Sequence, residues 1–211
     1  MIKVAITQRV EKVNSYEERR DCIDQRWASL LETLSIDILQ VPNGLIDTGG
    51  WLKRHEVQGL ILTGGNDLSY LLGASNPSKE RDLTEAALLT AAKDINLPVL
   101  GVCRGMQMIN FWFGGSMIPI ASHVATTHAV TALIENQWFS KSFMVNSYHS
   151  WGFMPEHLAT DLLPIVQAED GTVEAFKHTS LPWFGIMWHP ERNLSFSQQD
   201  QELIKSLFIE Y

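Results

Sequence analysis

The first half of the chain alternates short apolar runs with longer segments whose apolar residues recur at helical spacing. The short runs predict strands, and the run at 98–102 is continuously apolar, as expected of a strand buried on both faces. Strands that alternate with helices pair in parallel, so this half predicts βα units. The predicted strands cover residues 3–8, 36–41, 59–62 and 98–102, and the predicted helices cover 16–33, 48–55, 83–96 and 105–113.

After Gly114 and Gly115 the pattern changes to shorter, partly alternating segments, which are typical of antiparallel or mixed strands. A final helix is predicted over 197–211, with an apolar stripe that includes Leu203 and Leu207. The whole pattern predicts an α/β fold with a doubly wound, mostly parallel central sheet and a smaller antiparallel portion in the C-terminal half. The later predicted strands cover residues 125–134, 142–146, 162–168, 173–177 and 183–187.

Composition narrows the classes of protein. The chain has 211 residues, of which 45% are hydrophobic, and this suits one domain over residues 1–211. No apolar run is long enough to span a membrane and no signal peptide opens the chain, so we expect a cytoplasmic protein that does not bind membranes. A net charge of -8 argues against nucleic acid as a partner, although a local basic pocket stays open.

The two cysteines lie in different contexts. They are too few for a disulfide framework in a chain of this length. Cys22 suits an inert packing residue, whereas Cys103 stands between a predicted buried strand and a helix, with Gly101 and Gly105 on either side. This is the nucleophile-elbow pattern with cysteine in place of serine, and the helix N-terminus favours the attacking thiolate. Cys103 is therefore the candidate nucleophile.

A second motif, His-Pro-Glu at 189–191, ends the last predicted strand. Open α/β sheets bind ligands beyond the carboxyl ends of their strands, so this motif should lie beside the cysteine elbow. Cysteine catalysis needs a histidine near the sulfur and a third group that orients the ring. We expect His189 to carry the proton and Glu191 to orient His189, against the alternative of a polar surface turn.

The chain resembles the class I glutamine amidotransferase superfamily over nearly its whole length. The matching motifs are Leu-Thr-Gly-Gly at 62–65, Gly-Val-Cys-Arg-Gly-Met-Gln at 101–107 and Trp-His-Pro-Glu at 188–191. Segments 81–85, 145–149 and 168–171 are similar to its peptidase C26-like branch of γ-glutamyl hydrolases. The resemblance implies the flavodoxin-like fold of this superfamily and cleavage of γ-glutamyl amides through a γ-glutamyl thioester.

The resemblance also implies roles for further residues. The backbone N–H groups of Gly65 and Arg104 would form the oxyanion hole. Gln107 would hold the glutamyl end of the substrate, with an exposed helix position as the alternative. The opposite pocket wall would be formed by Asn146, Ser147, Tyr148 and His149, although a structural turn is an equal alternative for the last two.

Other polar groups are expected to be structural. Arg81, Asp82 and Glu85 should stabilise a helix start, and His123 and His128 should be satisfied or exposed histidines. No cysteine and histidine cluster has zinc spacing and no glycine-rich loop has a nucleotide-binding form, so no metal and no cofactor is expected.

The remaining alternatives differ in the substrate that the chain would cleave. The best expectation is a γ-glutamyl-CDP-amidate hydrolase of bacterial capsule biosynthesis, whose leaving group could meet Arg9 and Lys12, although a solvated loop is the preferred interpretation of residues 8–12. The stretch between Gly115 and Asn146 is short, and bulky residues at 111–113 fill a helix end, unlike in γ-glutamyl-γ-aminobutyrate hydrolases. Such a trimmed lid would leave room for a large leaving group.

Four alternatives stay open. The chain could hydrolyse γ-glutamyl-γ-aminobutyrate-type substrates, or it could be a glutaminase subunit that supplies ammonia to a synthetase. It could also be a catalytically silent scaffold or, at a greater distance, a DJ-1-like cysteine protein. The oligomeric state is open too, with a homodimer as one alternative.

Overall fold

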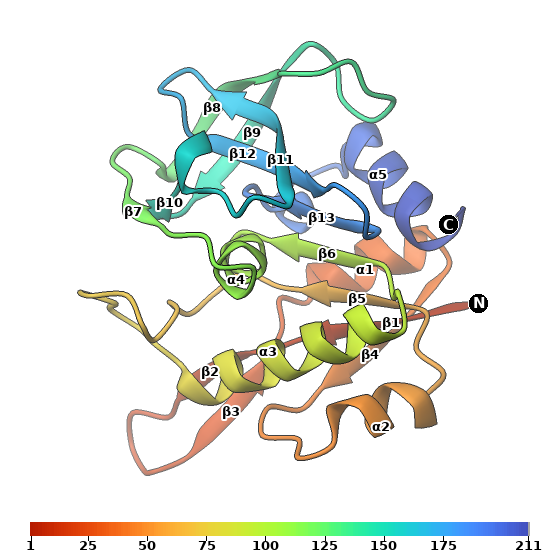
Figure 1. Cartoon of the computed structure of the whole chain (residues 1–211). Coiled ribbons are helices and arrows are strands. Elements are labelled where there is room, and N and C mark those ends of the chain that lie inside the picture. The colour runs from red at the N-terminus through yellow and green to blue at the C-terminus, as the bar shows by residue number, and fades with distance from the viewer. Residues whose placement is uncertain (211) are drawn as a thin grey trace.

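The computed structural model describes residues 1–210, which fold around one large mixed sheet (Figure 1). The strand order in this sheet is β4-β1-β5-β6-β13-β12-β11-β8-β9. Strands β4, β1, β5, β6 and β13 are parallel, and the remaining strands are antiparallel. Their bounds are β1 Ile2–Thr7, β4 Ile36–Val41, β5 Gly59–Leu62, β6 Val99–Val102, β8 Val124–Ala132, β9 Ser142–Tyr148, β11 Leu162–Ala168, β12 Val173–His178 and β13 Trp183–Ile186.

Helices cover both faces of the parallel half, so the predicted doubly wound sheet is confirmed. Side chains along β1 point alternately to the two faces of the sheet. Val4 and Ile6 pack with the helices at 26–33 and 198–208 on one face, while Ala5 packs with the helices at 48–54, 79–94 and 104–112 on the other. The helices are α1 Arg26–Thr33, α2 Thr48–Arg54, α3 Lys79–Asp94, α4 Arg104–Trp112 and α5 Gln198–Phe208. Ser78 caps the N-terminus of α3, because its side chain accepts a hydrogen bond from the Arg81 N–H.

Short elements complete the described chain. Strands β7 (Ile118–Pro119) and β10 (Trp151–Gly152) pair with each other, and 3-10 turns cover Pro155–His157 (η1) and Pro190–Arg192 (η2). In residues 1–210, no helix is long and apolar enough to cross a membrane. The predicted final helix ended at Tyr211, which lies outside the described residues.

The predicted helix over 16–33 is wrong in its first part. Its N-terminal residues form strand β3 (Arg19–Cys22), which pairs antiparallel with β2 (Arg9–Lys12). Residues 16–22 have no apolar stripe that a helix could bury, so hairpin pairing satisfies their backbone instead. Helix α1 begins only at Arg26, where Trp27, Leu30 and Leu31 supply a buried face.

Candidate active site

The site begins at the sharp turn between β6 and α4, where Cys103 has a φ of 52°. This left-handed conformation is rare for a residue with a side chain and marks a strained elbow. The flanking glycines permit it: a Cβ on Gly101 would lie 2.7 Å from the carbonyl of Gly105, and a Cβ on Gly105 would overlap the carbonyl oxygen of Leu62. The sequence therefore folds into the predicted nucleophile elbow.

His189 follows β13, the strand that pairs in parallel with β6. Its Nδ1–H donates to Glu191 Oε1 over 2.7 Å, and both side chains are buried. Asn146 fixes the backbone of this residue twice, because the His189 N–H donates to Asn146 Oδ1 (2.9 Å) and Asn146 Nδ2 donates to the His189 carbonyl (2.8 Å). Nδ1 of the ring is thus committed to Glu191, which leaves Nε2 for the sulfur.

The cysteine and the histidine meet above Gly64. A Cβ on Gly64 would overlap His189 Cε1 and lie 3.2 Å from His189 Nε2 and 3.4 Å from Cys103 Cβ. Burial disfavours the imidazolium, but the Cys103 thiolate, its hydrogen bond with the ring and the Glu191 carboxylate raise the pKa of His189 to about 9. The His189 ring therefore favours its imidazolium form beside the Cys103 sulfur.

A cavity of about 210 Å³ opens beside this pair, and Gly65, Arg104, Gln107, Tyr148 and His149 are among the residues that line it. Arg104 is the first residue of α4, so its N–H has no acceptor within the helix. Gly65 has a φ of 84° and faces the same cavity. Both predicted oxyanion-hole residues thus lie beside Cys103, and their role stays a prediction.

A buried ion network supports the loop at 63–65. Arg81 donates to the carbonyl oxygens of Thr63 (2.6 Å) and Gly64 (3.0 Å), and it also contacts the Gly65 carbonyl. Glu85 is fully buried between Arg81 and Arg104, and it accepts from Thr7 Oγ1 over 2.8 Å. Burial opposes its ionisation, but Arg104 and Arg81 outweigh this and lower the pKa of Glu85.

Arg104 also contacts Asp82, so the network joins the start of α3 to the first residue of α4. The three predicted scaffold residues of segment 81–85 therefore hold the two backbone segments expected to form the oxyanion hole. Their role is positional, because the network acts through the backbone at 63–65 and through Arg104.

The predicted pocket residues divide into two groups. Gln107 and His149 line the cavity, and both bond the carbonyl oxygen of Trp151, Gln107 Nε2 over 2.8 Å and His149 Nδ1 over 3.1 Å. Tyr148 also lines it, with its ring 5.7 Å from that of His189.

Asn146 and Ser147 do not line this cavity. Asn146 holds the His189 backbone, and Ser147 Oγ donates to the His123 carbonyl over 2.6 Å. These contacts are structural ones, so a direct contact between either residue and substrate stays a prediction.

Sequence reasoning missed one cation at the site. Arg192 lines the cavity, and its guanidinium carbon lies 4.5 Å from the ring centroid of Tyr148. Its position two residues after Pro190, at the end of η2, was the available signal. Arg9 packs against Gly65, where a Cβ would lie 2.8 Å from Arg9 Cδ, whereas Lys12 borders a different surface hollow.

An elbow cysteine beside a buried imidazole and carboxylate, on a doubly wound sheet, defines a cysteine hydrolase of the glutamine amidotransferase fold. The peptidase C26 family model matches residues 4–191, and the chain belongs to this family. It is a hydrolase.

Two curated relatives and one solved structure are similar to the chain. The γ-glutamyl-CDP-amidate hydrolase of Campylobacter jejuni is 37% identical over 191 residues, which cover 90% of each chain. Protein NtpR of Enterococcus hirae is 34% identical over 176 residues, covering 70% of this chain and 72% of its own. The crystal structure of a glutamine amidotransferase from Thermotoga maritima superposes with a TM-score of 0.65 at 17% identity, covering 97% of this chain and 83% of that chain.

Proposed function

We propose that the chain hydrolyses γ-glutamyl-CDP-amidate to glutamate and cytidine diphosphoramidate in capsule biosynthesis. The observation that carries this proposal is 37% identity over 90% of both chains to an enzyme of that name. The convergence of Cys103 and His189 above Gly64 supports it, because this pair can perform the amide cleavage that such a reaction requires. We place the reaction in the cytoplasm.

In the proposed mechanism, the Cys103 thiolate attacks the γ-carbonyl carbon. The resulting oxyanion is stabilised by the N–H groups of Gly65 and Arg104. The bond from carbon to nitrogen then breaks, the His189 imidazolium gives its proton to the departing nitrogen, and a γ-glutamyl thioester remains. Water, deprotonated by neutral His189, attacks the thioester and releases glutamate, which regenerates the thiolate and the imidazolium. Glu191 orients the ring throughout.

The leaving group carries a diphosphate, which calls for cations at the mouth of the site. Arg192 lines the cavity with its side chain 25% exposed, and planar guanidinium groups bind phosphate oxygens in pairs. Arg9 packs against Gly65, with its side chain 36% exposed. We assign the diphosphate first to Arg192 and second to Arg9, and Lys12 has no part in this assignment.

The test compares substrates under single-turnover and steady-state conditions. Purified chain is incubated with γ-glutamyl-CDP-amidate, γ-glutamyl-γ-aminobutyrate and glutamine, and glutamate release is measured. We expect kcat/KM to be highest for the CDP-amidate. Arg192→Gln should reduce kcat/KM for this substrate by about 10- to 100-fold, in line with about 1.5–3 kcal/mol for a hydrogen bond to a charged group.

The matched control is Arg54→Gln, which changes an exposed arginine on α2. It should leave all three rates unchanged. Equal kcat/KM for all three substrates would contradict the assigned leaving group while leaving the thioester chemistry intact. Glutamine hydrolysis that rises only with an added synthetase would instead identify a glutaminase subunit.

A further inference from the structure

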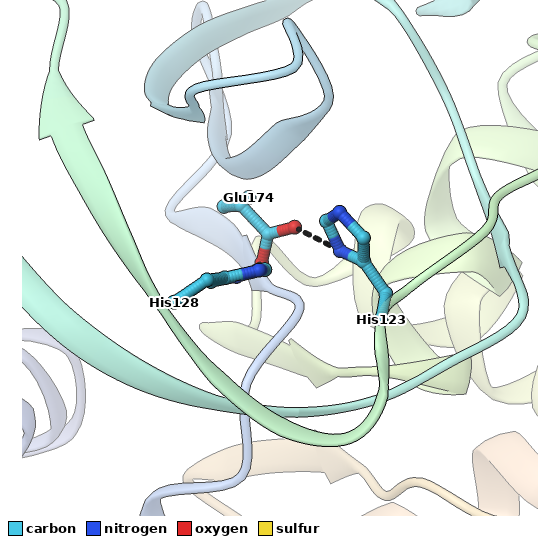
Figure 2. Close-up of side chains that lie close together, drawn as sticks. All are labelled: His123, His128 and Glu174. Atoms are coloured by element: carbon cyan, nitrogen blue, oxygen red, sulfur yellow. Dashed lines mark ion pairs between the residues drawn. The ribbon is translucent and has the colours of Figure 1, made fainter.

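A second cluster of buried titratable groups lies beside the active-site cavity. Figure 2 shows Glu174 between His123 and His128, with a dashed ion pair to His123. Glu174 lies on β12 and is fully buried, His128 lies on β8, and His123 directly precedes β8. His149, which follows β9, completes the group with its Nε2 3.4 Å from Glu174 Oε1.

The rings of His123 and His149 each make one hydrogen bond on the side away from Glu174. These bonds determine whether the nitrogen that faces Glu174 carries a proton. His149 Nδ1 lies 3.1 Å from the Trp151 carbonyl oxygen, which can only accept, so Nδ1 carries the proton. His123 Nε2 lies 3.0 Å from Asp170 Oδ2, and a carboxylate also accepts. In their neutral forms both rings therefore turn an unprotonated nitrogen toward Glu174.

With both rings neutral, three acceptors converge without a donor; the bond to Glu174 also raises the pKa of His123, so a proton on His123 is the competing way to satisfy Glu174. His123 Nδ1 and His149 Nε2 are 3.2 Å apart, and each lies 3.4 Å from Glu174 Oε1. A regular tetrahedron of ligands around Zn²⁺, with bonds of about 2.0–2.1 Å, has edges of about 3.3–3.4 Å. The observed triangle is close to one face of that tetrahedron.

His128 is the candidate for a fourth ligand, because its ligand atom and those of His123 and Glu174 all lie within 4.8 Å of one another. Its Nε2 lies 3.6 Å from Glu174 Oε2, and neither this nitrogen nor the two oxygens of Glu174 has a hydrogen-bond partner within residues 1–210. We propose that His123, His128, His149 and Glu174 bind a single Zn²⁺ ion. Asp170 and the Trp151 carbonyl are then the outer partners that orient metal-binding histidines.

The proposed zinc site is open to solvent on one side and contacts the active-site cavity on the other. A surface hollow of about 350 Å³, lined in part by Ser122, His128 and Asp170, opens onto the cluster. His149 also lines the active-site cavity, and the Trp151 carbonyl that it bonds accepts from Gln107 as well. A bound ion would therefore fix the wall opposite Cys103, which makes the zinc site a positioning device and not a catalytic one.

The test uses Zn²⁺ and Co²⁺ as probes on full-length Cys103→Ala protein, because the active-site thiolate is itself a candidate metal ligand. After treatment with a chelator, we expect uptake of one equivalent of Zn²⁺ by calorimetry and mass spectrometry. Bound Co²⁺ should show visible bands of nitrogen and oxygen ligation, and added Zn²⁺ should raise Tm. Asp170→Asn should weaken Zn²⁺ binding roughly 10- to 100-fold, as loss of an outer partner does, and Glu174→Gln by more.

His128→Ala is a second ligand variant in case Glu174→Gln does not fold. It should also lose the rise in Tm, while its Tm with excess chelator stays close to that of the parent. His55→Asn, which removes an exposed histidine at the end of α2, should bind Zn²⁺ like the parent. Absence of Zn²⁺ uptake, or uptake unchanged in both His128→Ala and Glu174→Gln, would overturn the proposal. Glu174 would then be balanced by protonated histidines alone.

Discussion

Gly64 lies where the side chains of Cys103 and His189 meet, and it has space for a hydrogen atom only. Arg81 donates to its carbonyl oxygen, so the loop cannot move away without breaking a partly buried hydrogen bond. The distance between sulfur and imidazole thus depends on a residue that carries no reactive group.

The first prediction follows from this contact. In Gly64→Ala the added methyl group displaces the His189 ring, and kcat should fall by about 10²- to 10⁴-fold, the usual contribution of proton transfer. Gly49→Ala is the control, since its Cβ would meet only Ala91 Cβ at 3.7 Å. Glutamate release measures both, and a Gly64→Ala variant with full kcat would show that the ring has room to move.

The second prediction concerns the charge on the imidazole. The Cys103 thiolate is the largest factor that raises the pKa of His189 to about 9. In Cys103→Ala that charge is gone while burial remains, so the pKa of His189 should fall. Titration of the ring nitrogens by NMR measures it, with His55 as an internal reference. An unchanged pKa would mean that the ring is not paired with the sulfur.

Among single residues, the sequence pointed to those that belong to compact motifs, and their catalytic roles stay predictions. Cys103, His189 and Glu191 lie in two short segments, and each segment carries its own glycine or proline signal. The cluster around Glu174 was missed because its members are spread over 123–174 and have no metal-ligand spacing. Only strand pairing brings them together, and pairing register cannot be read from the chain alone.

Among the elements, helix α5 supports the site from behind. Asp200 in its first turn accepts a hydrogen bond from Trp188 Nε1 over 2.8 Å, and Trp188 directly precedes His189. Burial is the main cause that raises the pKa of Asp200 to about 6, and the Glu191 charge adds to it. Helix α5 therefore positions the segment that carries His189 through the carboxyl group of Asp200, which is costly to ionise.

The third prediction is a pH-dependent stabilisation by Asp200→Asn. Between the ordinary pKa of 3.8 and about 6, the folded chain holds a proton that the unfolded chain releases, so this group lowers the free energy of unfolding as pH rises. Asparagine keeps an acceptor and has no charge to bury. At pH 8 the variant should be about 1–3 kcal/mol more stable than the parent by urea unfolding.

That gain should shrink toward pH 4, where Asp200 in the parent is itself neutral. Glu202→Gln, on the exposed side of the same helix, should show no such dependence on pH. A constant difference between Asp200→Asn and parent at all pH values would show that the Asp200 carboxyl group is not perturbed.

Element prediction succeeded where burial sets the pattern and failed where it does not. Strands β5 and β6 have all four residues buried, and their apolar runs gave their positions. The β2–β3 hairpin is partly exposed and charged, so neither helical nor strand periodicity marks it. Its pairing depends on contacts such as the Val10 N–H to Asn66 Oδ1, which join residues 56 positions apart.

For the whole molecule, the ion network around Glu85 links β1, the loop after β5, α3 and α4. All of these elements converge at the carboxyl edge of the parallel strands, where the cavity also lies. The network thus couples the stability of the sheet edge to the geometry of the site.

The fourth prediction tests that coupling. Glu85→Gln leaves two buried guanidinium groups short of a counter-charge, and it should lower the free energy of unfolding by about 3–5 kcal/mol. Glu56→Gln breaks only an exposed pair with Lys3 and should change it by about 1 kcal/mol or less. Urea unfolding measures the loss of stability in both variants. Equal losses would mean that the buried charge of Glu85 does not stabilise the fold.

The mostly parallel sheet followed from the order of predicted elements, since alternating strands and helices have few ways to pack. The sequence did not provide the order β13-β12-β11-β8-β9, because antiparallel strands of similar length and polarity can pair in several ways. The assignment of one domain over 1–211, and the oligomeric state, stay predictions.

The central claim is that Cys103 carries a γ-glutamyl group during turnover. Rapid acid quenching of the reaction with γ-glutamyl-CDP-amidate, followed by peptide mass spectrometry, tests it most directly. We predict a γ-glutamyl adduct on the peptide that contains Cys103, and none in Cys103→Ala, which should also release no glutamate. An adduct on Cys22, or glutamate release that persists at the parent rate in Cys103→Ala, would contradict the account.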